Sequence, residues 1–372
     1  MDFNFVFEGG GAKGLVFIGA MQAMEAAGYG YDRLMGTSAG AITATLLAAG
    51  YTTDELLAAS IEELPDGTRV FSTFLDVPTG FDAQDIAASA LFGALQGIDL
   101  PLIPERVEEK IDRAIMDRLM GSDKYRQIFS FIEKGGLYAG KAFYDFFQSK
   151  LDAGGRGLAN ATLAEMYAQT GRHLTLIAAD TTGAEMLVLN HITAPDCPVV
   201  WAVRMSMSVP FLWQEVRWDA AWGQYRQRDI SGHSIVDGGV LSNFPINLLI
   251  SKDVAVRQMM GEHNGLFTIG MLIDETLPLK RPDTSVEFFS LADVIDKLKN
   301  AETTQRIMRL IDTMTQAHDR QVIQAYADGV IRLPAEGYGT TDFDMDDKRM
   351  HDLILSARLT TEEFLAGFTP PT

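Results

Sequence analysis

Two glycine-rich turns near the N-terminus constrain this chain more than any other part of its sequence. Residues 9–14 read Gly-Gly-Gly-Ala-Lys-Gly and follow an apolar run, Phe3 to Phe7, with the composition of a buried strand. Residues 36–40 read Gly-Thr-Ser-Ala-Gly and lie between a second apolar run and a segment of helical pattern. This order of strand, loop, helix, strand, turn and helix predicts the start of a parallel α/β sheet.

The rest of the chain contains no internal repeat and no low-complexity linker, so we expect a single domain over residues 1–372. Between about 66 and 135, apolar residues are mixed with proline, glycine and aspartate, which indicates an insertion that forms a cap or lid, or simply packs against the core. The part from about 285 to 372 is expected to be mainly helical. We expect helices at 15–27, 41–49, 105–119, 142–151, 285–327 and 360–368, and strands at 3–8, 31–35, 174–179, 186–189, 199–203, 234–236, 267–273 and 330–333.

The charge balance excludes some partners. The 372 residues include 31 Lys and Arg against 50 Asp and Glu, which gives a formal net charge of −19. Nucleic acid is therefore not an expected partner, because phosphate contacts require clustered basic residues. Strong attraction to an anionic membrane is not expected either, whereas transient contact with a membrane surface through apolar side chains remains compatible with this charge.

The sequence also bears on where the protein acts. No apolar run has the length needed to span a bilayer, and the first strand is not preceded by a Sec-type signal. The single cysteine, Cys197, excludes an internal disulfide and fits a reducing compartment. We therefore expect a cytoplasmic protein, with export by a route other than Sec, or peripheral attachment to a membrane, as the alternatives.

Ser38 lies at the centre of the second turn, in the pattern Gly-x-Ser-x-Gly. A serine at a sharp bend between a strand and a helix is exposed for nucleophilic attack, and glycines such as Gly36 and Gly40 make room for the bend. The helix N-terminus behind the serine would favour the negative charge that develops during acyl transfer. The alternative is that Ser38 only caps the helix.

The first turn has two interpretations. The pattern Gly9-x-Gly11-x-x-Gly14 meets the dinucleotide fingerprint, but such a site also requires an acidic residue at the end of the second strand, and Asp32 lies at its start. No Walker A lysine follows any glycine-rich loop, and we expect Lys13 to be solvated. We favour an oxyanion hole, in which backbone N–H groups face one developing charge. Its residues would be Gly9, Gly10, Gly11, Ala12 and Gly14.

A serine nucleophile needs a base. An aspartate, Asp237, follows an apolar strand and precedes Gly238 and Gly239. At the C-terminal edge of a parallel sheet, its carboxylate would stand beside other strand ends and accept the serine proton directly; a plain Asp-Gly turn is the alternative. None of the histidines lies in a recognisable catalytic context: His173, His191, His233, His263, His318 and His351.

Together these motifs resemble the patatin-like phospholipase family. The Gly-Gly-Gly-Ala-Lys-Gly loop, the Gly-Thr-Ser-Ala-Gly turn and the Asp-Gly-Gly sequence occur in order, and residues 204–211 and 243–245 are similar to the family's stretches on either side of the aspartate. The resemblance covers residues 3–250, the motif-bearing core. It implies a three-layer α/β/α fold with a mainly parallel central sheet.

The resemblance also implies an activity. It implies a hydrolase of the phospholipase A or lysophospholipase type, which cleaves fatty acyl esters of phospholipids or lysophospholipids through an acyl-enzyme, without calcium, another metal or a cofactor. Ser38 would be the nucleophile and Asp237 the base of a Ser–Asp dyad, with Gly10 and Gly11 the main oxyanion donors. The candidates for the acyl-binding or membrane-facing surface are the apolar residues between Phe71 and Leu95, with Trp213, Trp218 and Trp222.

Overall fold

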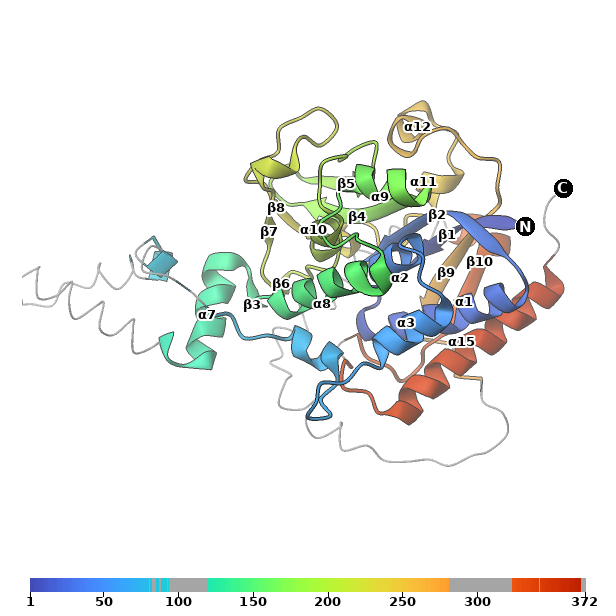
Figure 1. The fold of residues 1–372 in the computed structure, drawn as a ribbon, viewed down its shortest axis with the longest axis horizontal. Coiled ribbons are helices and arrows are strands. Elements are labelled where there is room, and N and C mark those ends of the chain that lie inside the picture. The colour runs from blue at the N-terminus through green and yellow to red at the C-terminus, as the bar shows by residue number, and fades with distance from the viewer. Residues whose placement is uncertain are drawn as a thin grey trace, which may run out of the picture.

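A computed structural model describes residues 1–79, 81, 85, 86, 88–91, 93, 120–280, 323–340 and 342–368. The expected helix at 105–119 and nearly all of the expected helical segment at 285–327 lie outside the described residues. Figure 1 shows a central sheet with helices on both sides of it. The sheet contains segments from both ends of the chain, because β9 and β10 lie beside β1.

The strands of the main sheet are ordered β10, β9, β1, β2, β4, β8 and β7, with β5 attached to β4. The pairs from β10 to β4 are parallel, whereas β4–β8, β8–β7 and β4–β5 are antiparallel. A separate two-stranded sheet pairs β3 (Gly136–Tyr138) with β6 (Phe211–Trp213). The bounds in the main sheet are β1 (Asp2–Phe7), β2 (Gly30–Thr37), β4 (His173–Asp180), β5 (Glu185–Leu189), β7 (Val216–Arg217), β8 (Ser234–Asp237), β9 (Thr268–Asp274) and β10 (Val330–Pro334).

Helices cover the two faces of this sheet unequally. One face packs against α1, α2 and α15, and the other packs against the short helices α11 and α12. The helix bounds are α1 (Val16–Ala26), α2 (Ala39–Ala48), α3 (Thr53–Ser60), α7 (Asp123–Lys134), α8 (Lys141–Asp152), α9 (Leu163–Thr170), α10 (Val199–Ser206), α11 (Asn247–Ile250), α12 (Val254–Met260) and α15 (Asp347–Gly367).

The alternation of side chains in β1 explains the layering. Phe3, Phe5 and Phe7 belong to the larger core cluster, whereas Val6 belongs to the cluster on the opposite face. Successive residues of a strand point to opposite faces, and residues 3–7 of β1 are all buried, so both faces of this strand are covered. The predicted three-layer α/β/α fold with a mainly parallel sheet is therefore confirmed.

Two of the predicted elements differ from those observed. The expected strand at 199–203 is wrong, because these residues form α10, with Pro198 at its N-cap. Val199, Val200, Ala202 and Val203 are all buried, and a short run that is apolar on every side carries no periodicity to separate helix from strand. The closing helix begins at Asp347 rather than Thr360, with Asp346 accepting a capping hydrogen bond from the Arg349 N–H.

Candidate functional site

Two strands of the main sheet meet end to end at the candidate site. β2 and β8 pair with the same edge of β4, because β5 occupies the other edge. The last residue of β2, Thr37, lies opposite Ile177 of β4, and the last residue of β8, Asp237, lies opposite Ala178. Ser38 follows Thr37 directly, so the serine and the aspartate reach neighbouring positions from opposite directions.

This arrangement corrects one expectation. β8 runs antiparallel to β4, so Asp237 does not end a parallel strand. It still comes to lie beside the end of β2, because β4 extends past β2 by three residues, 178–180, and β8 pairs with that extension.

Ser38 adopts a strained backbone conformation between β2 and α2, with φ 52° and ψ −118°. Such a positive φ is uncommon for a residue with a side chain and is found mainly where the surrounding structure imposes it. The flanking glycines permit the bend, since a Cβ at Gly36 would collide with the backbone of Gly40, and a Cβ at Gly40 would collide with the carbonyl of Phe7. The side chain makes no capping hydrogen bond, so the alternative that Ser38 serves as a helix cap is wrong.

Asp237 is buried, and burial raises the pKa of its carboxyl to about 7. Two neighbours counteract part of the rise: the N–H of Gly239, which donates to Oδ1 at 2.7 Å, and the Ser38 hydroxyl. The Asp-Gly turn thus accounts for Oδ1 only. Oδ2 is buried and accepts no well-aligned hydrogen bond from the described residues. The Ser38 hydroxyl nevertheless lies close enough to the carboxyl of Asp237 to lower its pKa. Such contacts are often poorly aligned in the absence of substrate.

Two of the backbone N–H groups of residues 9–12 in the glycine loop donate hydrogen bonds within the protein, and two do not. The N–H of Gly9 donates to the carbonyl of Asn243 at 3.1 Å, and that of Ala12 donates to the carbonyl of Thr340 at 2.9 Å. Within the described part of the chain, the N–H groups of Gly10 and Gly11 donate to no acceptor. These two groups, with Ser38 and Asp237, line one cleft.

Asn243 fixes this loop through both its backbone and its side chain. Its Nδ2 donates to the carbonyl of Gly9 at 2.8 Å. In return, its backbone carbonyl accepts the hydrogen bond from the N–H of Gly9. A Cβ at Gly9 would collide with the Asn243 side chain and press on Cβ of Ser38. In the sequence, Asn243 lies in a stretch that resembles the family, and no pattern around it indicates this role.

The stretch from Arg204 to Ser208 also supports the site, in a way that was not anticipated. The N–H of Ser38 donates to Oγ of Ser206 at 3.0 Å, and the N–H of Asp237 donates to the carbonyl of Ser208 at 2.8 Å. Arg204 is buried and donates to Oγ of Ser208 and to the carbonyl of Ala139. This stretch therefore holds both strand ends.

Lys13 differs from its expected state. Its side chain is 4% exposed rather than solvated, and its Nζ pairs with the carboxylate of Glu275, which follows β9. The ion pair joins the glycine loop to the neighbouring strand of the sheet. A buried lysine with one carboxylate partner is costly to leave unpaired.

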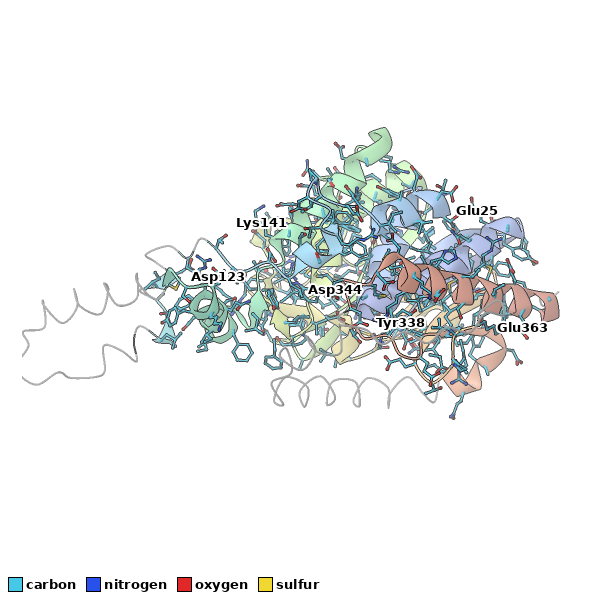
Figure 2. All side chains as sticks on the ribbon, turned by 90° about the horizontal axis from the view of Figure 1, so that it is seen from below. Glu25, Asp123, Lys141, Tyr338, Asp344 and Glu363 are labelled. Carbon is cyan, nitrogen blue, oxygen red and sulfur yellow. The ribbon has the colours of Figure 1, made fainter. Side chains whose placement is uncertain are left out.

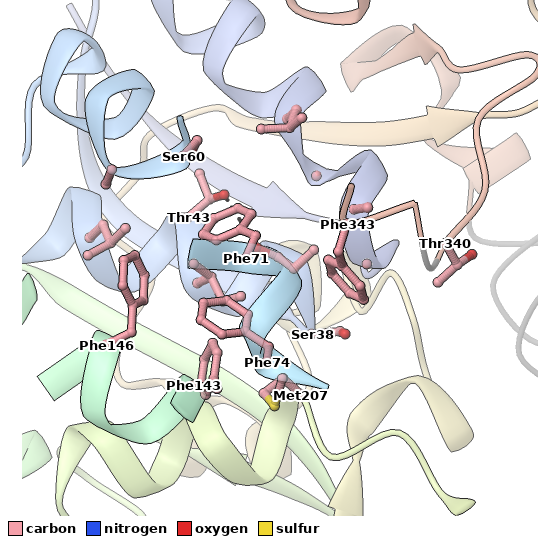
Figure 3. A pocket seen from close by; sticks show the side chains of 18 of the residues that line it. Ser38, Thr43, Ser60, Phe71, Phe74, Phe143, Phe146, Met207, Thr340 and Phe343 are labelled. Carbon is pink, nitrogen blue, oxygen red and sulfur yellow. Dashed lines mark hydrogen bonds between the residues drawn. The ribbon is translucent and has the colours of Figure 1, made fainter. Parts of the chain in front are cut away.

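Two cavities meet at Ser38. The first is a narrow apolar pocket of about 90 Å³, in which Figure 3 shows the rings of Phe71, Phe74, Phe143 and Phe146 gathered on one side of Ser38. The second is a polar cleft of about 840 Å³. Charged side chains line the cleft, among them Glu8, Lys13, Asp237, Asp274, Glu275 and Arg332.

The tryptophans expected at an apolar surface lie in different places. Trp213 lines the apolar pocket and donates its Nε1–H to the carbonyl of Phe74 at 2.9 Å. Trp218 and Trp222 are buried against each other in the core and line neither cavity at Ser38, so that part of the expectation is wrong. Phe71 and Phe74 pack against α8 and line the pocket, whereas Phe92 and Leu95 lie outside the described residues.

No histidine is among the described residues that line the two cavities. His233 pairs with Asp180 at 2.7 Å, and His173 and His191 form a cluster with Tyr167. His318 lies outside the described part of the chain. Asp32, which the dinucleotide interpretation would require at the other end of β2, accepts a hydrogen bond of 2.7 Å from Asn264.

Comparison with known proteins decides the family. The family described as patatin-like phospholipase matches residues 5–250. The chain belongs to the patatin-like phospholipase family. Its membership supports activity as a lipid acyl hydrolase. The chain is also 30% identical over 379 residues to the uncharacterized protein YqhO of Bacillus subtilis, covering 99% of this chain and 100% of YqhO.

Two solved structures are more distantly similar. VipD from Legionella pneumophila aligns with 98% of this chain and 67% of its own, at 15% identity and a TM-score of 0.46. The type III effector ExoU of Pseudomonas aeruginosa aligns with 98% of this chain and 53% of its own, at 17% identity and a TM-score of 0.42.

Proposed function

We propose that this protein hydrolyses fatty acyl esters of phospholipids or lysophospholipids, as a phospholipase A or lysophospholipase, with Ser38 as nucleophile and Asp237 as base. The observation that carries the proposal is the end-to-end meeting of β2 and β8, which puts a strained serine beside a buried carboxylate that the serine hydroxyl can reach. Family membership supports a lipid ester as the substrate.

In the proposed first step, Oδ2 of Asp237 accepts the proton of Ser38 while Oγ attacks the ester carbonyl. The resulting oxyanion accepts hydrogen bonds from the N–H groups of Gly10 and Gly11, which point to no other described acceptor. The glycines at 9 and 14 and Ala12 would contribute by holding the loop in place. Asp237 then passes its proton to the leaving alcohol oxygen, and the acyl group remains on Ser38.

The second step releases the fatty acid. Asp237 removes a proton from a water molecule as that water attacks the acyl-enzyme, and then returns the proton to Oγ of Ser38. The apolar pocket would hold the acyl chain and the wider polar cleft the head group. Because each proton and charge in this cycle has a protein partner, we propose that the reaction needs no calcium and no cofactor, so EDTA should leave the rate unchanged.

A fluorophosphonate probe tests the proposal, because it labels only an activated serine. The wild-type protein should be labelled, Ser38→Ala should not, and Asp237→Asn should be labelled at least about 10²-fold more slowly. His233→Ala is the matched control and should behave like the wild type, since its ring pairs with Asp180 outside both cavities. Equal labelling of Asp237→Asn would rule out the dyad. Lipid mass spectrometry with mixed phospholipids, wild type against Ser38→Ala, would identify the ester cleaved.

No helix in the described part of the chain is long and apolar enough to cross a membrane. We propose a cytoplasmic protein, or one exported without a Sec signal, that reaches its lipid substrate by transient contact with a membrane surface.

A further inference from the structure

An exposed apolar patch lies on α7 and β6. Ile128, Phe131 and Ile132 are 52%, 39% and 49% exposed, and their spacing puts them on one face of α7. Phe211 of β6 is 40% exposed, and its ring centroid lies 5.8 Å from that of Phe131. We call these four residues the α7 patch. Monomeric proteins rarely gather large exposed apolar side chains in one place without a partner.

The opposite face of α7 is already used. Phe129 is fully buried, against Phe81, Leu91 and Tyr125 among others. Phe129 is therefore enclosed by its neighbours in the chain, whereas Ile128, Phe131 and Ile132 stay exposed. Figure 1 shows α7 at one end of the described part of the fold, and Figure 2 shows Asp123, its first residue, at the same end.

Phe211 is exposed and has a strained backbone conformation. Its φ is 68°, a conformation that bulky residues rarely adopt. The N–H of Phe211 donates to the carbonyl of Gly135 at the end of α7, and β3 and β6 pair at this position. Backbone strain at an exposed aromatic residue points to a function rather than to packing.

The patch is continuous along the chain with the pocket at Ser38. Val209, Leu212 and Trp213, on either side of Phe211, line the apolar pocket. Residues 209–213 read Val-Pro-Phe-Leu-Trp. The α7 patch and the apolar pocket therefore share one short apolar segment of the chain.

The charges around the patch identify the partner. Arg126 pairs with Asp123 at 2.5 Å, Lys134 pairs with Asp85 at 2.9 Å, and Glu133 accepts a hydrogen bond from the Leu91 N–H. With Asp85 included, the formal charges of α7 cancel, because Lys124, Arg126 and Lys134 balance Asp123, Glu133 and Asp85, and the whole chain is acidic. An anionic surface gains little from such a site, whereas a surface without net charge can bury the apolar side chains.

We propose that the α7 patch docks the protein on zwitterionic phospholipid bilayers, with Phe131 and Phe211 entering the headgroup region. The proposal deepens the proposed lipid hydrolase function, in that docking would deliver an acyl chain to the pocket. Docking itself does not depend on catalysis.

The test measures binding to phosphatidylcholine vesicles by flotation, in a Ser38→Ala background that prevents any hydrolysis. The triple variant Ile128→Ser/Phe131→Ser/Ile132→Ser should weaken binding about tenfold or more, because each removes apolar area from the interface. Phe211→Asn should weaken it as well, since asparagine tolerates a positive φ. Raising the salt concentration should have little effect.

The matched control replaces exposed apolar residues elsewhere. Ile192→Ser/Val254→Ser removes side chains that are 41% and 59% exposed, and Figure 1 shows α12, which carries Val254, well away from α7. This control should bind vesicles as the Ser38→Ala protein does. With Ser38 restored, the triple α7 variant should hydrolyse a short soluble ester within about twofold of the wild-type rate.

Four results would overturn the proposal. The patch variants could bind vesicles as well as the Ser38→Ala protein does, or the control could lose as much binding as they do. Binding could require anionic lipid and disappear at high salt, or the patch substitutions could convert a dimer to a monomer while vesicle binding stays intact. The last result would show that a second copy of the chain covers the patch. If no ester is ever hydrolysed, the proposed function fails, while the binding measurements still decide the role of the patch.

Discussion

Ser38 and Ser206 are joined by a hydrogen bond of 3.0 Å from the backbone N–H of the first to Oγ of the second. The Ser206 hydroxyl in turn donates to the carbonyl of Ile177 in β4, at 2.6 Å. A buried side chain at the end of α10 therefore connects the strained turn to the strand that also pairs with β8. The position of the proposed nucleophile depends on this link.

Replacing Ser206 with alanine should lower turnover of a soluble ester by about 10- to 100-fold, because a small displacement of a reacting group has effects of this order. It should also cost about 1–3 kcal/mol in unfolding free energy, since a buried N–H and a buried carbonyl lose their partner. Steady-state kinetics and denaturant unfolding measure the two effects separately.

Ser356→Ala is the matched control for this loss. Ser356 is also a fully buried serine in a helix, and its Oγ accepts the N–H of Lys280 at 2.8 Å, away from both cavities. It should lose similar stability and keep its turnover. An equal fall in turnover in both variants would show that Ser206 acts only through global stability.

The pH profile of hydrolysis should follow the carboxyl of Asp237. Burial raises its pKa to about 7, and only the ionised form can accept the Ser38 proton. We therefore expect kcat/KM for a soluble, neutral ester to rise tenfold per pH unit below about 7 and to level off above it. A flat profile between pH 5 and 8 would contradict the role of Asp237 as base.

Asp237→Asn should make the protein more stable at pH 8 while abolishing hydrolysis. The folded-state pKa lies above the ordinary value of 3.8, so this group's contribution to stability is present below pH 3.8 and lost as the pH rises through about 7. Asparagine carries no charge at any of these pH values, so the variant avoids this loss of unfolding free energy. The loss is at most about 4 kcal/mol, because one pKa unit corresponds to about 1.4 kcal/mol. Thermal unfolding should show a gain at pH 8 and little difference at pH 4, whereas a lower melting temperature at pH 8 would contradict it.

His191→Phe should reduce the acid sensitivity of the fold. Burial, with His173 and Arg33 nearby, lowers the pKa of His191 to about 4 from 6.5. Between pH 6.5 and about 4, His191 is mostly protonated in the unfolded chain and mostly neutral in the folded protein. The free energy of unfolding therefore falls as the pH drops from 6.5 toward 4. Phenylalanine keeps the stack on Tyr167, whose ring centroid lies 3.8 Å away.

Urea unfolding at pH 7.5 and pH 5 measures this effect. The stability lost between the two values should be smaller in His191→Phe than in the wild type. A matched change at exposed His351 should leave the wild-type loss unaltered, and identical losses in all three proteins would exclude the cluster as the cause.

The sequence allowed the main features of the site to be predicted because they are local. Gly36 and Gly40 are needed for a bend around a residue only two positions away from each, and Asp237 stands at the end of an apolar run. Strand direction is not local. Nothing within residues 234–237 shows that β8 is antiparallel, since direction is decided by how the preceding chain returns to β4.

The supporting contacts were missed for the same reason. Lys13 was expected to be solvated, but its partner, Glu275, lies 262 residues away and is brought close by the pairing of β1 with β9. Ser206 gave no signal of its own in a helix in which every residue except Trp201 is buried. The resemblance of residues 204–211 to the family indicated that this stretch matters, but it did not reveal the role of Ser206.

The shared edge of β4 has a consequence for how the site can fail. Ser38 follows β2 and Asp237 ends β8, and these two strands are not paired with each other, so the separation of the two residues is set by the register of each strand along β4. A slip of one residue in either strand would change that separation by about 3.3 Å and turn the strand's side chains to the opposite face. One residue inserted between Ile177 and Ala178 would therefore pull the serine and the aspartate apart while leaving every motif in the sequence intact.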